Sequence, residues 1–223
     1  MLITGGTGGL GEAVLATFVA DGWRVVAPVR PGSTTILPDG VTRFEADVTS
    51  PTDVGAAVAV AAGEAAAPLR AVVNLVGGYR VTGLVHETPV DDFEAMLRIN
   101  LRPTYLVTSA ALPHLVAAGG GSVVCVSSRA AVAPFARAAG YVTSKAAVLA
   151  FANAVAVEYR KQGVRANTVL PSVIDTPANR ESQPDIDFSR WVTPAEIAQV
   201  ILFLAGDGSK PTSGATIPVY GQS

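Results

Sequence analysis

The sequence of 223 residues is poor in cysteine, in aromatic side chains and in charge. Its single cysteine, Cys125, can form neither an internal disulfide nor a metal cluster, which is typical of a reducing compartment. Aromatic residues make up 6% of the chain and charged residues 15%, and the formal net charge is −2. Because there is no basic surplus to neutralise phosphate groups, we expect no nucleic-acid binding.

Long hydrophobic runs and metal-ligand clusters are also lacking. The most apolar windows, such as 54–67, are rich in alanine and fall short of the ~20 apolar residues that span a membrane. No secretory signal pattern opens the chain. His86 and His114 have no cysteine or carboxylate partner at ligand spacing. We therefore predict a cytoplasmic protein without a membrane segment or a metal site.

What the sequence has in abundance is alternation. Hydrophobic residues make up 49% of the chain, which excludes disorder. Short runs rich in Val and Ile predict buried parallel strands at Arg24–Val29, Arg43–Asp47, Ala71–Val76, Ser122–Ser127, Arg165–Leu170 and Thr216–Val219. Ala- and Leu-rich segments with helical spacing lie between them. This order predicts an α/β fold, with a single-domain, doubly wound parallel sheet and helices on both faces over residues 1–223.

Helix boundaries are marked by three similar patterns. Ser50-Pro51-Thr52-Asp53, Thr88-Pro89-Val90-Asp91 and Thr193-Pro194-Ala195-Glu196 each place a hydroxyl, a proline and an acid where a helix should begin. Gly22, Gly119 and Gly163 stand where helices should end.

A glycine-rich turn follows the first apolar residues, in the order Thr4-Gly5-Gly6-Thr7-Gly8-Gly9-Leu10-Gly11. Glycines between a strand and a helix allow a tight turn and let a pyrophosphate approach the backbone N–H groups at the helix start. No Gly-Lys-Ser/Thr follows, so this is not a nucleoside-triphosphate loop. The position predicts a Rossmann-type dinucleotide site.

The residue that ends the second strand bears on the choice of cofactor. A carboxylate there would favour a free ribose 2′-hydroxyl, but the chain has Val29 followed by Arg30. A guanidinium can pair with a 2′-phosphate, so NADP(H) is favoured and NAD(H) remains possible. In the alternative interpretation Arg30 is only a solvated loop residue.

Tyr141 and Lys145 lie four residues apart, on one face of a predicted helix. A nearby ammonium favours the phenolate and would lower the pKa of the tyrosine toward useful proton transfer. Ser128 lies thirteen residues before Tyr141, where the strand 122–127 ends. Its hydroxyl could orient a carbonyl or alcohol oxygen of a substrate.

With these motifs in this order, the whole chain resembles the short-chain dehydrogenase/reductase family. The turn resembles the family's TGxxxGxG, Tyr141 and Lys145 its YxxxK, and Ser128 its catalytic serine. The resemblance makes Tyr141 the acid/base, and it makes Lys145 the residue that binds the nicotinamide ribose and lowers the Tyr141 pKa. It also makes Asn100 the holder of a proton-relay water. The cofactor contacts that we predict are Gly5, Thr7, Gly9, Leu10, Gly11, Arg30, Asp47, Val48, Asn74, Gly77, Tyr141, Lys145, Ile174 and Thr176.

Three features depart from the family pattern. The family's NNAG is here Asn74-Leu75-Val76-Gly77, and its Pro-Gly step is Pro171-Ser172. The first strand should be short, because Thr4 follows only three residues. The expected substrate loop, roughly 172–192, is similar to that of dihydropteridine reductases, as is Gly77-Gly78-Tyr79, although those enzymes lack the serine and prefer NADH.

The resemblance implies an NADPH-dependent reductase of ketones or aldehydes that uses Tyr141 as acid/base. An NAD-dependent alcohol dehydrogenase and a pteridine-type reductase are alternatives, and a non-catalytic dinucleotide sensor is an alternative of another class. Two apolar helices, expected at Phe93–Ala117 and Ala139–Arg160, would bury their outer faces in a homodimer or homotetramer.

Overall fold

The computed structural model describes residues 1–222 and is built on one parallel sheet of seven strands. The strand order is β3-β2-β1-β4-β5-β6-β7. The strands are β1 Leu2–Thr4, β2 Val25–Val29, β3 Val41–Glu45, β4 Ala71–Asn74, β5 Gly121–Val126, β6 Val164–Pro171 and β7 Thr216–Val219. The predicted doubly wound α/β fold is confirmed, and the strand order reverses between β1 and β4.

Buried apolar strands explain why the sheet lies at the centre. β1, β2 and β4 are buried along their whole length, as a parallel sheet covered on both faces requires. The short first strand is confirmed: Leu2 pairs with Val26 of β2 on one side and with Val72 of β4 on the other. Its three residues are therefore held between two longer strands.

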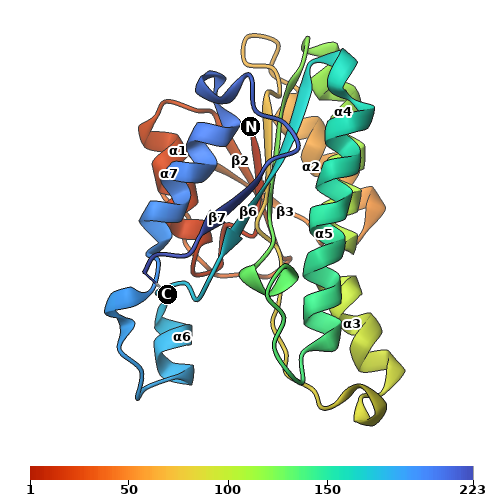
Figure 1. Cartoon of the computed structure of the whole chain (residues 1–223). Coiled ribbons are helices and arrows are strands. Elements are labelled where there is room, and N and C mark those ends of the chain that lie inside the picture. Colours follow the sequence, from red (N-terminus) through yellow and green to blue (C-terminus); the bar gives the residue numbers. More distant parts are fainter. Residues whose placement is uncertain (223) are drawn as a thin grey trace.

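Helices cover both faces of this sheet, as Figure 1 shows. One face carries α1 and α7, which pack against each other, and the other face carries α2, α4 and α5. The helices are α1 Gly11–Ala20, α2 Pro51–Ala62, α3 Val90–Asn100, α4 Arg102–Ala117, α5 Ala139–Glu158, α6 Pro177–Ser182 and α7 Pro194–Ala205. Short 3-10 turns lie at Val85–Glu87, Arg129–Ala131, Arg160–Gln162, Phe188–Arg190 and Asp207–Ser209.

Two of the three predicted helix starts are confirmed. Ser50 accepts a hydrogen bond from the backbone of Asp53, and Thr193 forms a reciprocal capping box with Glu196. The prediction for Thr88 is wrong. Its hydroxyl instead donates to Leu84 O at 3.1 Å, and α3 begins one residue later than expected, after Pro89. The Thr88 side chain therefore forms a local hydrogen bond with the preceding turn and does not cap α3.

The single helix expected at Phe93–Ala117 is also wrong. The structure divides it into α3 and α4 at Leu101. Pro103 has no backbone N–H and cannot continue the hydrogen-bond ladder through this point. The break is useful for the site, because Asn100 stands at the end of α3 instead of in the middle of a helix.

By length and composition, α5 is the one helix in residues 1–222 that could cross a membrane. In the fold it packs against α3, β5 and β6, and its buried residues belong to the core on that face of the sheet. Its apolar character is thus used in packing. The same helix carries Tyr141 and Lys145 in its first two turns.

Candidate functional site

The carboxyl ends of β1 and β4 bring the glycine-rich turn beside the loop that follows β4. Gly5 has φ +75°, and a Cβ on it would lie 2.9 Å from Val76 N. A Cβ on Gly11 would lie 2.3 Å from Gly5 O. Both positions therefore need glycine, the first for its backbone angle and both for the close approach of the chain.

At the start of α1, no side chain of the described residues 1–222 caps the first backbone N–H groups. The residue before the helix, Leu10, makes no side-chain capping bond. Thr7 and Gly9 are exposed on the same turn, and a Cβ on Gly9 would lie 2.8 Å from Thr176 Cγ2. An open helix N-terminus with its donors facing outward suits a pyrophosphate. The narrow gap between this turn and Thr176 leaves room only for glycine.

The ends of β2 and β3 bring Arg30 and Asp47 near each other. Both side chains are exposed, and Val48 packs against the core beneath them. Hydrogen bonds from Thr49 are the main reason that the pKa of Asp47 is lowered, and the positive charge of Arg30 adds a smaller effect. This corner therefore holds one cation and one carboxylate at the place expected for the adenosine end of a dinucleotide.

Asn74 and Gly77 follow β4 but serve different ends. The Asn74 side chain is buried and donates to Thr108 Oγ1 at 3.0 Å, so it ties β4 to α4, and its predicted cofactor contact stays a prediction. Gly77 lies against the centre of the site. A Cβ there would lie 2.7 Å from Asn100 Oδ1 and 2.9 Å from Lys145 Nζ.

Asn100 is fully buried and joins three segments. Its Oδ1 accepts from Gly78 N at 2.8 Å, and its Nδ2 donates to Gly78 O at 3.1 Å and to Ser144 Oγ at 2.9 Å. Ser144 is the neighbour of Lys145 on α5. The amide of Asn100 therefore fixes the loop after β4 relative to the helix that carries the predicted acid/base.

Tyr141 and Ser128 meet at the carboxyl end of β5. Both side chains line the same cavity, and the Ser128 hydroxyl also accepts from Ala130 N at 3.2 Å. Burial nevertheless raises the pKa of Tyr141 above its ordinary value, and Tyr79 adds to this, against the lowering effect of Ser128. The expected lowering of the Tyr141 pKa is therefore wrong for the chain by itself, because desolvation penalises the phenolate more than the Ser128 hydroxyl stabilises it.

Lys145 is a buried cation. Its side chain is 6% exposed, and Nζ donates to Val126 O at 3.2 Å. Burial lowers the pKa of Lys145 to about 8, although Cys125 opposes this shift. A second tie, from Ser127 Oγ to Lys145 O at 2.7 Å, holds this turn of α5 against β5. The ammonium is thus fixed in place with one carbonyl partner.

A cavity of about 750 Å³ opens beside these groups. Leu10, Gly77, Ser128, Tyr141, Lys145 and Ile174 line it, so the structure brings six of the predicted residues to one space. Sequence reasoning missed Phe135 and Arg129, which line the same cavity. No local pattern indicates them, because their place depends on how the 129–138 segment folds over the site.

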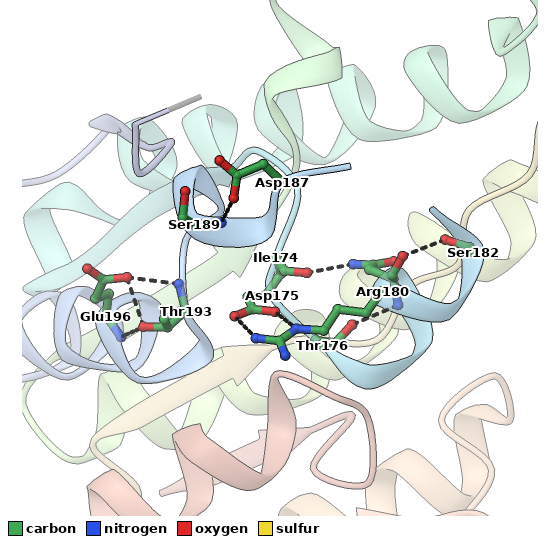
Figure 2. Close-up of polar contacts among 10 residues, drawn as sticks. Ile174, Asp175, Thr176, Arg180, Ser182, Asp187, Ser189, Thr193 and Glu196 are labelled. Atoms are coloured by element: carbon green, nitrogen blue, oxygen red, sulfur yellow. Dashed lines mark hydrogen bonds and ion pairs between the residues drawn. The ribbon is translucent and has the colours of Figure 1, made fainter. Parts of the chain in front are cut away.

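The segment 172–192 lies over the carboxyl ends of β5 and β6 and is held by short polar contacts (Figure 2). Thr176 caps α6 by accepting from Asn179 N, and Asp175 forms a two-point ion pair with Arg180, at 2.5 and 2.7 Å. A bridge between Ile174 and Val192 closes the base of the segment. The backbone of Ile174 and Thr176 is thereby fixed at the wall of the site.

These features fit a bound nicotinamide dinucleotide. The uncapped start of α1 would face the pyrophosphate, Arg30 and Asp47 the adenosine half, and Ile174 and Lys145 the nicotinamide half. Gly5 and Gly9 lie where a side chain would close the cradle. In the part of the chain that the structure describes, no group of three or more His, Cys, Asp and Glu side chains could hold a metal ion.

Comparison with known proteins agrees with this geometry. The model of the short chain dehydrogenase family matches residues 1–187. A 2-(R)-hydroxypropyl-CoM dehydrogenase from Xanthobacter autotrophicus is 34% identical, over 99% of this chain and 96% of its own. A 2,5-dichloro-2,5-cyclohexadiene-1,4-diol dehydrogenase, LinX, from Sphingobium indicum is 32% identical over 99% and 94%.

A solved structure is similar as well. The structure of ElxO with NADP bound superimposes with a TM-score of 0.89 and 25% sequence identity, over 99% of this chain and 96% of that one. The similarity therefore covers nearly the whole of this fold.

Proposed function

The chain belongs to the short-chain dehydrogenase family, is an oxidoreductase of hydroxyl and carbonyl groups, and on that premise we propose that it is an NADPH-dependent reductase of ketones or aldehydes. The observation that carries the proposal is the meeting of Ser128, Tyr141 and Lys145 at the wall of one cavity. A tyrosine, a serine and a buried cation at one cavity wall suit proton transfer to an oxygen atom.

The chemistry divides between cofactor and protein. When bound, the reduced nicotinamide supplies a hydride to the carbonyl carbon. Ser128 holds the substrate oxygen by a hydrogen bond, and Tyr141 gives its phenolic proton to that oxygen as the carbon–oxygen π electrons move onto it. In the reverse direction Tyr141 takes the proton from an alcohol. Its raised pKa keeps the phenol protonated at neutral pH, which suits the reductive direction.

Lys145 and Asn100 prepare the site for this step. In the proposed site Lys145 Nζ hydrogen-bonds the nicotinamide ribose and stabilises the phenolate left on Tyr141. Asn100 holds Gly78 on one side and Ser144 on the other, so it keeps the cavity wall in register with α5. The expected proton-relay water at Asn100 stays a prediction.

Arg30 supports NADPH as the cofactor, because its exposed guanidinium stands at the end of β2, where a 2′-phosphate would lie. The NADP bound in ElxO supports the same choice. One observation favours NAD(H) as the second candidate: Asp47, whose pKa is lowered, stands beside Arg30 and would repel a phosphate. We further propose that residues 1–223 form one domain and that the protein is a cytoplasmic homodimer or homotetramer. We propose that it binds neither nucleic acid nor a membrane.

The test of the reaction is NADPH oxidation in the presence of a panel of ketones and aldehydes. Tyr141→Phe should lower turnover by at least ~10²-fold, because the general acid is lost. Its affinity for NADPH should stay within about twofold of the parent. Turnover that survives in the variant would overturn the mechanism, and tight NADPH binding without turnover of any substrate would support the sensor alternative.

Cofactor choice is tested by parallel fluorescence titrations with NADPH and NADH. We expect NADPH to bind at least tenfold more tightly, a difference of ~1.4 kcal/mol. Arg30→Ala should remove that preference and leave the affinity for NADH unchanged. A parent protein that prefers NADH would contradict the NADPH assignment and favour an NAD-dependent dehydrogenase.

A further inference from the structure

Three aromatic rings form a continuous row at the mouth of the cavity. Tyr79 packs edge-on against Tyr141, with ring centroids 5.0 Å apart and an interplanar angle of 86°. On its other side Tyr79 meets Phe135 at 6.3 Å and 50°. Both Tyr79 and Phe135 line the cavity with Tyr141. The row therefore leads from the proposed proton donor outward to the entrance.

The two outer rings of this row are open to solvent. Tyr79 is 62% exposed and Phe135 46%. Exposed rings side by side at a cavity mouth present apolar surface that a ligand can cover. The entrance is thus apolar on the aromatic side, and among the described lining residues no carboxylate stands ready to pair with a cation.

Hydrogen bonds fix the backbone of the two segments that carry these rings. Asn100 makes a donor and an acceptor bond with Gly78, the residue immediately before Tyr79. Thr82 N donates to Arg137 O at 2.9 Å, and this bond joins the loop after Tyr79 to the segment that carries Phe135. Because the backbone of both segments is already ordered, little conformational entropy is lost there when a ligand binds between the rings.

We propose that Tyr79 and Phe135 select substrates in which a flat, unsaturated ring is attached to the reacting carbonyl carbon. The proposal rests on the proposed function, because Tyr141 must lie at the substrate oxygen. With that oxygen at Tyr141, the group on the carbonyl carbon falls beside Tyr79, the nearest ring in the row. A flat ring can then stack offset or edge-to-face on Tyr79 and Phe135, which a saturated, puckered ring of similar size does less well.

The alternative is that Tyr79 merely shields Tyr141 from water. Shielding would affect every substrate equally, whereas ring recognition would affect flat substrates alone. Acetophenone and cyclohexyl methyl ketone separate the two, because they share a carbon skeleton and differ in the flatness of the ring. The informative quantity is the ratio of their kcat/KM values in each variant relative to the parent, since this cancels their difference in intrinsic reactivity.

Tyr79→Leu and Phe135→Leu keep apolar bulk and remove the ring. We expect Tyr79→Leu to lower the ratio of acetophenone to cyclohexyl methyl ketone about tenfold, and Phe135→Leu about threefold. Tyr105→Leu is the matched control. Tyr105 is 52% exposed and contacts Phe151 on the helices α4 and α5, away from the lining of the cavity. It should leave the ratio unchanged.

An equal fall in kcat/KM for both ketones in Tyr79→Leu would overturn ring recognition in favour of shielding, and kcat/KM values equal to the parent's would overturn both roles of Tyr79. If the parent turned over no ketone at all, the proposed function would fail separately. In that case quenching of NADPH fluorescence by each ketone still decides the question. Tighter binding of acetophenone that is lost in Tyr79→Leu would support the ring site, and equal binding of both ketones would refute it.

Discussion

The two edges of the sheet use their polar groups in opposite ways. At the amino edge, where the amino ends of the parallel strands lie, arginine side chains donate hydrogen bonds to the last carbonyl groups of helices. Arg24 bonds Val60 O and Ala61 O at the end of α2, and Arg165 bonds Leu204 O and Gly206 O at the end of α7. These guanidinium groups satisfy carbonyl groups that a helix end leaves without a partner, and they face the negative end of the helix dipole.

At the carboxyl edge α1 begins with an open N-terminus, whereas α2 and α7 are capped by Ser50 and Thr193. The turn before α1 is rich in glycine, and no side chain in residues 1–222 caps the first N–H groups of the helix. A cavity of about 810 Å³ lies among the arginines of the amino edge, and the one beside Tyr141 measures about 750 Å³. Size therefore does not tell the two apart. The difference that matters is whether the hydrogen-bond donors beside each cavity already have partners within the protein.

The largest effect is expected at Lys145. Lys145→Met should lower kcat/KM at least ~10²-fold, because the cation that supports proton transfer is lost. Stability should stay the same or rise, since a buried ammonium with a single carbonyl partner is costly to desolvate. Turnover assays and thermal unfolding of the same samples measure both. If Lys145→Met unfolded, Lys145 would be needed for stability, and the prediction that it serves function at a cost in stability would be wrong.

Arg165 at the amino edge should show the opposite outcome. Arg165→Met removes bonds to Leu204 O, Gly206 O and Ser209 Oγ, and we expect the free energy of unfolding to fall by about 2 kcal/mol with kcat/KM unchanged. Arg160→Met is the matched control. Arg160 lines the same cavity, but its side chain makes no hydrogen bond or ion pair within residues 1–222, so denaturant unfolding should detect no change. Equal losses in both variants would refute the capping role of Arg165.

How far the sequence predicts this molecule follows from the range of each interaction. The strands and the capping of α2 and α7 depend on residues a few positions apart, and the structure contains them, although β3 lies two residues earlier than predicted and β4 ends two residues earlier. Thr88 fails because a competing acceptor, Leu84 O, comes from the preceding turn. Tyr141 and Lys145 stand in a short pattern with fixed spacing and Ser128 at the end of a predicted strand, whereas Asn100 is predicted only by the family resemblance.

What the sequence does not predict depends on residues far apart in the chain. Tyr79 and Phe135 are 56 positions apart, and only the folded loops bring their rings within 6.3 Å. The direction of the Tyr141 pKa shift is likewise a consequence of burial among several segments. The spacing of Tyr141 and Lys145 predicts a lowered Tyr141 pKa, but the largest cause of the shift is desolvation, which is a property of the tertiary structure.

A smaller effect should appear in the pH dependence of stability. Burial lowers the pKa of Lys145 from 10.5 to about 8, so between these values the unfolded chain binds a proton that the folded chain has released. Stability therefore rises with pH across this window, by about 1 kcal/mol from pH 7.5 to 9. Lys145→Met should lack that rise. Because Cys125 and Tyr141, with their raised pKa values, act in the opposite sense at higher pH, the difference between variant and parent is the quantity to measure.

Parallel slopes in the variant and the parent between pH 7.5 and 9 would show that Lys145 keeps its ordinary pKa in the folded chain. The amino edge again supplies the control. Arg165→Met should follow the parent's slope, because an arginine remains protonated throughout this range. The two variants thus separate a titrating donor from a permanently charged one.

The smallest effect compares two threonines that cap helices at different distances from the cavity. Thr193 caps α7, a core helix, and Thr193→Ala should lower the free energy of unfolding by about 1 kcal/mol without a change in KM. Thr176 caps α6, a helix of only six residues beside the glycine-rich turn. A helix this short contributes little to global stability, so Thr176→Ala should cost only a few tenths of a kcal/mol but raise the Kd for NADPH severalfold. Chemical denaturation and fluorescence titration measure the pair. If Thr193→Ala weakened NADPH binding as much as Thr176→Ala, the two caps would not differ in function, and the contrast between core and site would not hold at this edge.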